Sequence, residues 1–203
     1  MQRNKSCGRC FIIAGVILIL LAAILVAWNL YQDSNGGKSA ASVLKELNNE
    51  ITADDSDNDL PNESFDDTYS ENESVIELDG KKYIGIISVP KISLELPVMS
   101  QWSYANLDIS PCRYMGSVAE KNLIIAAHNY TSFFDRIDEL NSGDEIIFTE
   151  CSGRVHKYSV SMTELINGGD VSGMESNSDD WDLTLFTCTW SGWSRVTVRA
   201  VEA

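Results

Sequence analysis

Few side chains in this sequence could carry out nucleophilic chemistry. The chain holds five cysteines and two histidines, and a nucleophilic cysteine needs a base and an oxyanion-stabilising group close to it. Cys188 ends one strand-like run and Arg195 begins the next, with Gly192 in the short segment between them. If that segment joins two neighbouring strands, the two side chains face each other across a ladder. A guanidinium there would hold a thiolate, a peptide carbonyl or its tetrahedral oxyanion.

His128 is the stronger of the two candidate bases. It follows the apolar run 123–127, and the end of a strand is where a side chain leaves the core and enters a cleft. His156 lies in a run that we expect to form an exposed strand face, so we interpret it as structural. Arg199 is four residues beyond Arg195 and would share its strand face, which makes it the rival for the arginine role.

The segment that must position these side chains begins at residue 75. From there, short runs rich in β-branched and aromatic residues alternate with turn signals such as NSGD at 141–144. One helix is predicted over 131–140, where apolar residues recur at helical spacing. Many short strands with one or two helices predict a closed barrel or a sandwich. The predicted strands cover residues 83–89, 94–98, 123–127, 145–148, 155–165, 183–188 and 195–201.

An apolar run of membrane-spanning length precedes this segment. Residues 11–28 carry no charge and would form about 27 Å of helix, close to the hydrocarbon thickness of a bilayer. The run is longer than a signal-peptide core and ends without a cleavage site, so we predict a retained anchor over 11–30. Basic residues in 1–10 place the N-terminus in the cytoplasm and everything after residue 31 outside.

The intervening residues 31–74 are strongly acidic. A short helix is possible over 38–50, with Leu47 on its apolar face, but 52–74 is too polar to bury much surface and is predicted to be a solvated, largely disordered tether. A substrate-mimicking lid or a cation-binding tail is the alternative. The formal net charge of the chain is −15, and no Lys/Arg cluster lies beyond residue 10, which excludes nucleic-acid binding. The domains expected are thus 1–10, 11–30, 31–74 and 75–203.

The sequence around Cys188 resembles a known family. Residues 184–188 read TLFTC and match the TLxTC signature of sortases, the membrane-anchored cysteine transpeptidases of Gram-positive bacteria. Residues 84–92 and 94–98 resemble the first two strands of that family, and 124–128 resembles the strand that leads to its catalytic histidine. The resemblance extends over most of 83–203. It implies a mainly-β fold, an eight-stranded barrel with one or two short helices behind an N-terminal transmembrane helix.

The resemblance also implies a role for each candidate residue. Cys188 would attack the Thr–Gly bond of an LPxTG-like sorting signal and form a thioacyl-enzyme. His128 would protonate the leaving amine and later deprotonate the incoming one, and Arg195 would bind the oxyanion or the substrate carbonyl. The incoming amine would come from a peptidoglycan precursor or from a lysine of a pilin. No metal or organic cofactor takes part in this chemistry.

Further residues are expected near the substrate. Thr187 lies beside the nucleophile, Trp190 could wall the cleft, and Ala127 stands where sortases usually carry glycine. Ordinary packing is the alternative for Thr187 and Trp190. The lid tripeptide of class C and the long insert of class B are absent from the sequence, which favours a class A-, D- or E-like member.

Two features outside the proposed chemistry are left open by the sequence. The acidic loop 165–182, with Asp170, Glu175, Asp179 and Asp180, could bind calcium together with Glu164, although acidic loops are common. Cys112 and Cys151 are the only cysteines that could form a disulfide outside the cell, because Cys7 and Cys10 precede the anchor and Cys188 must stay reduced.

Two other classes of function compete with transpeptidation. One is a membrane-tethered cysteine peptidase that transfers the acyl group to water alone. The other is a surface binding module that uses the barrel without catalysis, in which Cys188 would be unreactive.

Overall fold

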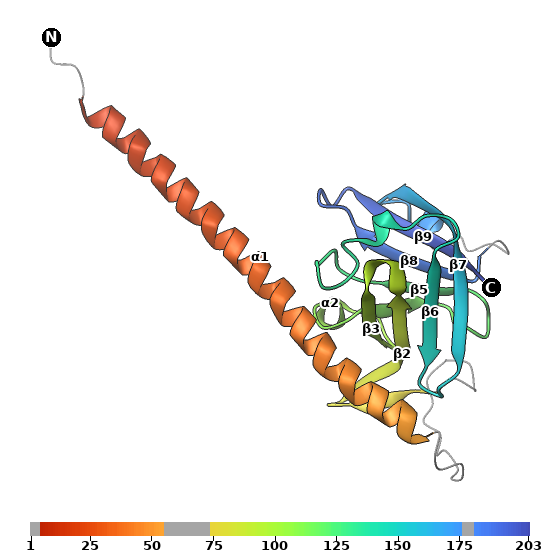
Figure 1. The fold of residues 1–203 in the computed structure, drawn as a ribbon. Helices are drawn as coiled ribbons and strands as arrows, with labels where there is room; N and C mark the ends of the chain where they lie inside the picture. Colours follow the sequence, from red (N-terminus) through yellow and green to blue (C-terminus); the bar gives the residue numbers. More distant parts are fainter. Residues whose placement is uncertain (1–4, 55–73, 176–180) are drawn as a thin grey trace.

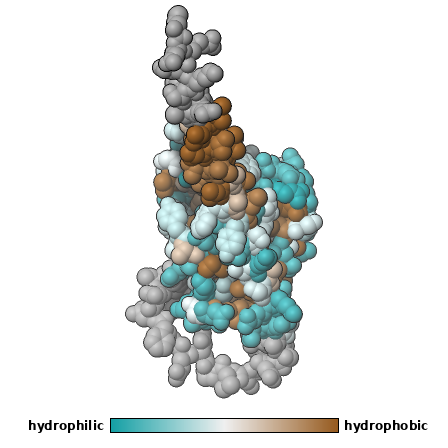
Figure 2. Space-filling model, turned by 90° about the vertical axis from the view of Figure 1, so that its left-hand side faces the viewer, coloured by the Kyte–Doolittle hydropathy of each residue, from teal (hydrophilic) through white to brown (hydrophobic). Residues whose placement is uncertain are grey.

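The computed structural model describes residues 5–54, 74–175 and 181–203. A long helix, α1 (Lys5–Asp54), runs beside a β-barrel, and its N-terminal half extends away from the barrel (Figure 1). The apolar part of α1 forms a continuous hydrophobic surface beyond the barrel (Figure 2), and its large side chains are exposed. By length and composition α1 is the one helix among the described residues that could cross a membrane.

Eight strands close into the barrel that the sequence predicted. They follow the order β2-β3-β4-β5-β8-β9-β7-β6, and β6 pairs again with β2. A short additional strand, β1, pairs with the start of β2. The strands are β1 (Ile76–Leu78), β2 (Lys81–Val89), β3 (Leu94–Met99), β4 (Cys112–Met115), β5 (Leu123–Ala126), β6 (Glu145–Glu150), β7 (Val155–Asn167), β8 (Leu183–Cys188) and β9 (Ser194–Glu202).

The strands bury different faces because period-2 alternation sends successive side chains to opposite sides. Ile125, Leu185 and Val198 belong to the cluster that fills the barrel. Ile124 and Phe186 belong to a second cluster on the outer face. The parallel pair β5–β8 is therefore buried on both faces, as the unbroken apolar sequence of β5 indicates.

The helices within the barrel domain are short, as expected. They are α2 (Tyr104–Leu107) and α3 (Val171–Glu175), with 3-10 turns η1 (Pro90–Ile92) and η2 (Ile137–Glu139). The helix predicted over 131–140 is instead a series of turns that ends in η2. Its apolar residues are buried as their spacing indicated, but Phe133 and Phe134 donate their backbone N–H groups to Tyr130 and His128, three and six residues back, which does not give an α-helical ladder.

The C-terminal half of α1 packs against the barrel. Ala40, Leu47 and Ile51 are buried, and Leu47 and Ile51 join the outer cluster with Tyr83 and Met99. The helix thus extends well beyond the short segment 38–50 expected within the tether, because the barrel covers its apolar face. The rest of the expected tether, residues 55–73, lies outside the described residues.

Candidate active site

Cys188 and Arg195 face each other at the end of the β8–β9 ladder. They are its last residue pair, as the spacing in the sequence predicted. The connection between them is a tight hairpin, in which the Thr189 N–H donates to Ser194 at 2.9 Å and the Gly192 N–H donates to Thr189 at 2.8 Å. Gly192 has φ 73°, a conformation that glycine adopts without strain. The hairpin therefore fixes the register that brings the thiol opposite the guanidinium.

His128 reaches the same edge from the neighbouring strand. β5 runs parallel to β8 with Ala126 opposite Phe186, and the pairing continues where the Ala127 N–H donates to Phe186 at 3.2 Å. Two residues further along each chain, His128 and Cys188 arrive at the same level. Alternation puts both on the outer face of the barrel. Three adjacent strands, β5, β8 and β9, thus bring His128, Cys188 and Arg195 to one edge.

The imidazole of His128 has two neighbours that the sequence did not reveal. Its Nε2 lies 3.2 Å from the Asp108 carboxylate, and its ring packs on Tyr130 at a centroid separation of 4.8 Å. Burial, and after it the charge of Asp108, raises the pKa of Tyr130, so this residue stays a neutral phenol. Asp108 can therefore hold the ring in place.

The Arg195 side chain lies over the hairpin. Its Nη1 donates to the Gly192 carbonyl at 3.0 Å and to the Ser194 carbonyl at 3.2 Å. Gly168 lies against it, and a Cβ there would approach Nη1 to 2.8 Å. Arg195 and Cys188 are both half-buried, so a ligand can reach them from solvent.

Arg199, the rival arginine, is occupied by the fold. It is 1% exposed and its Nε donates to Glu164 at 3.1 Å. Its other nitrogens donate to Thr184 Oγ1 and to the carbonyls of Gly173 and Met174. These contacts fasten α3 to the barrel.

The three residues expected near substrate lie in two different environments. Thr187 and Ala127 are buried beneath the site, where the Thr187 hydroxyl donates to the Ala127 carbonyl at 2.8 Å. Trp190 is 79% exposed in the hairpin beside Cys188. Only Trp190 of the three therefore presents its side chain to a ligand.

His156, Cys112 and Cys151 have structural contacts. His156 lies between Glu150 and Glu202, at 2.6 and 3.3 Å, and its side chain is only 11% exposed. The prediction of an exposed strand face was therefore wrong at this residue. The thiol of Cys112 donates to Ser110 and that of Cys151 donates to Tyr83, so these two do not form a disulfide with each other. Burial raises the pKa of Cys112 to about 12.

Those suggested calcium ligands that the structure describes make other contacts. Glu164 pairs with Arg199, Glu175 accepts from Tyr114, and Asp170 accepts from Gly173 within α3. Asp179 and Asp180 lie outside the described residues. Over the described ranges, no three His, Cys, Asp or Glu side chains come close enough together to hold a metal.

Comparisons with known proteins agree with this geometry. A family model described as a sortase domain matches residues 87–203. A curated relative, sortase A of Bacillus anthracis, is 30% identical over 119 residues, which are 55% of this chain and 54% of that protein. The match thus spans about half of that relative's length.

Solved structures share the barrel fold. A Clostridium perfringens sortase D5 transpeptidase has a TM-score of 0.59 at 21% identity, covering 84% of this chain and 99% of that one. Sortase C-3 of Streptococcus pneumoniae has a TM-score of 0.53 at 20% identity, covering 85% and 90%. Sortase E1 of Streptomyces coelicolor, solved with a tripeptide in its active site, has a TM-score of 0.53 at 21% identity, covering 60% and 88%.

Proposed function

The chain belongs to the sortase family, and we propose that it is a cysteine transpeptidase that cleaves an LPxTG-like sorting signal and transfers the acyl fragment to an amine. The observation that carries this proposal is the convergence of three strands. The parallel β5–β8 register and the antiparallel β8–β9 register place His128, Cys188 and Arg195 side by side at one edge. A nucleophile with a base on one side and a cation on the other supplies the parts that acyl transfer through a thioester requires.

The first half-reaction forms the thioester. The Cys188 thiolate attacks the threonine carbonyl of the signal, and the developing oxyanion is held by the charge and N–H donors of Arg195. As the C–N bond breaks, protonated His128 gives its proton to the leaving amine. Asp108, 3.2 Å from the imidazole Nε2, holds the ring in place for this transfer.

The second half-reaction releases the product. An incoming amine attacks the thioester, His128 accepts one of its protons, and the C–S bond breaks to restore the thiolate. The result is a new amide bond, with no net change in protonation of the enzyme. Trp190 and the hairpin stand beside the nucleophile and offer an apolar wall for the signal. We propose an amine of a peptidoglycan precursor or of a pilin lysine as the acceptor.

The position of the anchor completes the proposal. Basic residues precede the apolar part of α1, so the positive-inside rule places the N-terminus in the cytoplasm and the barrel on the outer surface. There the barrel would meet sorting signals of exported proteins together with acceptors of the cell wall.

A single ligation assay tests activity and location together. The full chain in detergent micelles is incubated with a library of LPxTG-like peptides and a small amine, beside Cys188→Ala, and products are read by mass spectrometry. We expect an amine-capped peptide that the variant does not form. The same mixture added outside intact cells should give product only if the barrel faces outward.

Other products would identify the competing functions. Cleavage that is indifferent to the amine would show a peptidase. Absence of any product, together with failure of a thiol reagent to modify Cys188 at pH 7, would show a binding module. Cys112 serves as the internal control in that labelling, because a buried thiol whose pKa is raised to about 12 stays protonated at pH 7.

A further inference from the structure

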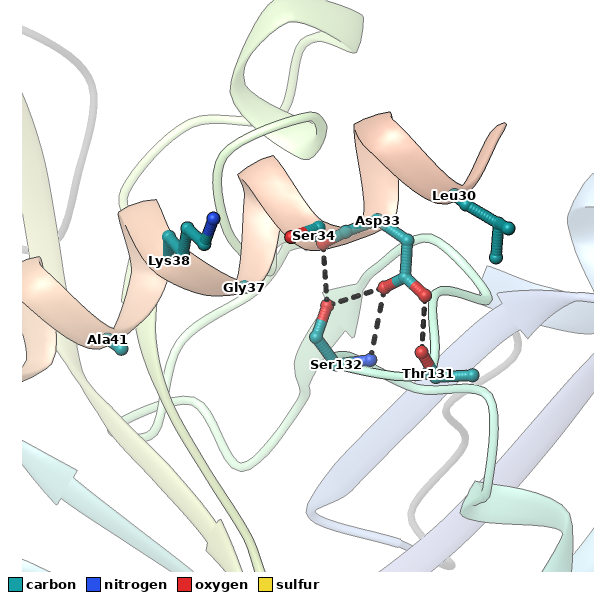
Figure 3. A pocket seen from close by; sticks show the side chains of 8 residues that line it. All are labelled: Leu30, Asp33, Ser34, Gly37, Lys38, Ala41, Thr131 and Ser132. Atoms are coloured by element: carbon teal, nitrogen blue, oxygen red, sulfur yellow. Dashed lines mark hydrogen bonds between the residues drawn. The ribbon is translucent and has the colours of Figure 1, made fainter. Parts of the chain in front are cut away.

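The helix α1 is hydrogen-bonded to the loop that carries His128. Just beyond its apolar part, the Asp33 carboxylate accepts hydrogen bonds from the Ser132 hydroxyl at 2.8 Å, from the Ser132 N–H at 3.3 Å and from the Thr131 hydroxyl. Figure 3 shows these bonds bridging a groove between α1 and the loop. One residue nearer His128, the Tyr130 hydroxyl donates to Gln32 at 3.4 Å. We call Asp33, Thr131 and Ser132 the Asp33 clasp.

Two helical glycines bring α1 close enough for this contact. A Cβ on Gly37 would approach the Ser132 Cβ to 2.8 Å, and a Cβ on Gly36 would approach the Asp108 carbonyl to 3.1 Å and Phe133 to 3.2 Å. A glycine within a helix costs about 1 kcal/mol relative to alanine. The pair is therefore explained by close approach, at the place where the helix meets both the loop and Asp108.

The loop held in this way sets the position of the imidazole. Tyr130 stacks on the His128 ring at 4.8 Å and on Phe133 at 5.4 Å. The Phe134 N–H donates to the His128 carbonyl at 3.2 Å. Tyr130, which lies between His128 and the clasp, thus contacts the imidazole, the core and α1. Beyond the clasp, the loop is held by Phe133 and Phe134, which are buried in the core.

The electrostatics favour a charged clasp. Burial opposes ionisation of Asp33, but the hydrogen bonds from Thr131 and Ser132 outweigh it and lower the pKa of this carboxyl. It is therefore a carboxylate at neutral pH. Hydrogen bonds to a charged acceptor are stronger than neutral ones, so an amide in its place would hold the loop less firmly.

We propose that Asp33 is a positioning residue of the transpeptidase, which holds the His128 loop in its working place from the anchor helix. The proposal rests on the proposed function of His128 as the acid and base. It makes α1 part of the catalytic unit as well as a membrane anchor. Loss of the clasp should slow proton transfer and leave the binding of the sorting peptide unchanged.

The kinetic test compares two charge-neutralising changes on the same helix. In the full chain in detergent micelles, Asp33→Asn should lower kcat about tenfold, which corresponds to about 1.4 kcal/mol, while KM for the sorting peptide stays within a factor of about two. Glu50→Gln is the matched control, because Glu50 is exposed on α1. It should leave kcat unchanged. Equal values of kcat in the two variants and the parent chain would overturn the proposal.

A second measurement needs no substrate. The chain has two histidines, so selective isotope labelling gives one set of imidazole NMR signals for His128 and one for His156. Asp33→Asn should shift or broaden the His128 signals and leave those of His156, which is held by Glu150 and Glu202, in place. Unmoved His128 signals would contradict the clasp even if no peptide substrate were found. Activity that survives Cys188→Ala would instead contradict the proposed function.

A third variant guards against general misfolding. If Asp33→Asn moved the signals of both histidines, Ser132→Ala would replace it as the test, because this change removes one clasp donor and leaves α1 intact. Ser132→Ala should lower kcat in the same direction, and the double variant should lose less than the sum of the two single losses, since both remove the same interaction. Losses that simply add would show that the two residues act independently.

Discussion

Two arginines of β9 each pair with a small polar residue of β8, but their surroundings differ. At one end of the β8–β9 ladder Arg195 faces Cys188, and one pair before the other end Arg199 faces Thr184. Both arginines project from the outer face of the same strand. Arg199 is 1% exposed and has partners on four residues, whereas the Nη1 of Arg195 donates to carbonyls of its own hairpin and the side chain remains half-exposed.

The difference lies in what covers each end. The segment that carries α3 lies over Arg199, and the ring of Trp181 is 5.0 Å from its guanidinium. A charge in such surroundings is tolerated only when its hydrogen-bonding groups are satisfied. Arg195 stays half-exposed among the described residues, so a ligand can reach its guanidinium. Position along the strand, rather than residue type, thus separates the structural arginine from the one that we propose is catalytic.

The largest effect on stability is expected from substitution of Arg199, the covered arginine. Arg199→Met keeps the length of the stem and removes the charge, which leaves Glu164 and two backbone carbonyls without their donor. We expect the free energy of unfolding to fall by about 3–5 kcal/mol, measured by denaturant unfolding. Arg199→Lys should lose less, because the charge remains but the planar fork of donors does not. A loss below about 1 kcal/mol for Arg199→Met would show that Arg199 contributes little to the stability of the fold.

The same substitution at Arg195 should lower activity and leave stability almost unchanged. Arg195→Met removes the group that we propose stabilises the oxyanion, so kcat should fall about 10²–10³-fold, or about 2.7–4 kcal/mol. The free energy of unfolding should change by no more than about 0.5 kcal/mol. Steady-state kinetics and denaturant unfolding on one preparation give both values. If Arg195→Met instead unfolded the barrel and left kcat intact, the roles of the two arginines would be exchanged.

The sequence predicted contacts between residues that are close along the chain, and it missed contacts that depend on distant segments. The pairing of Cys188 with Arg195 follows from a short hairpin, and a local pattern is enough to predict it. The sequence also showed that the two arginines share a face, but what covers each one depends on α3, which the register alone does not reveal. The apolar spacing of 131–140 gave the buried residues correctly and the α-helix wrongly, because turns can bury the same side chains.

The contacts that orient His128 are long-range and had no local signal. Asp108 approaches it from the end of α2, and Asp33 meets Thr131 across 98 residues of sequence. Residues 31–54 read as part of an acidic tether, because a single apolar stripe on an otherwise polar helix is stable only when another surface covers it. The glycine pair within that helix was the one visible sign of a close partner, since helix propensity alone disfavours it.

Two threonines on the β8–β9 ladder test the comparison at a finer scale. Thr187 points into the barrel, where its hydroxyl donates to the Ala127 carbonyl at 2.8 Å. Thr187→Val keeps the shape of the side chain and removes this bond between β8 and the residue before His128. We expect the free energy of unfolding to fall by about 1–3 kcal/mol, since a buried acceptor loses its donor.

Thr197 lies between the two arginines on the outer face of β9 and gives the matched control. It is fully buried, and its hydroxyl has no hydrogen-bond partner in the part of the chain that the structure describes. Because a buried hydroxyl without a partner already costs free energy, Thr197→Val should be neutral or should raise the free energy of unfolding by up to about 1 kcal/mol. Denaturant unfolding of the two valine variants side by side measures the contrast. Equal destabilisation would mean that burial alone, and not the hydrogen bond to Ala127, determines how much each threonine contributes to the free energy of unfolding.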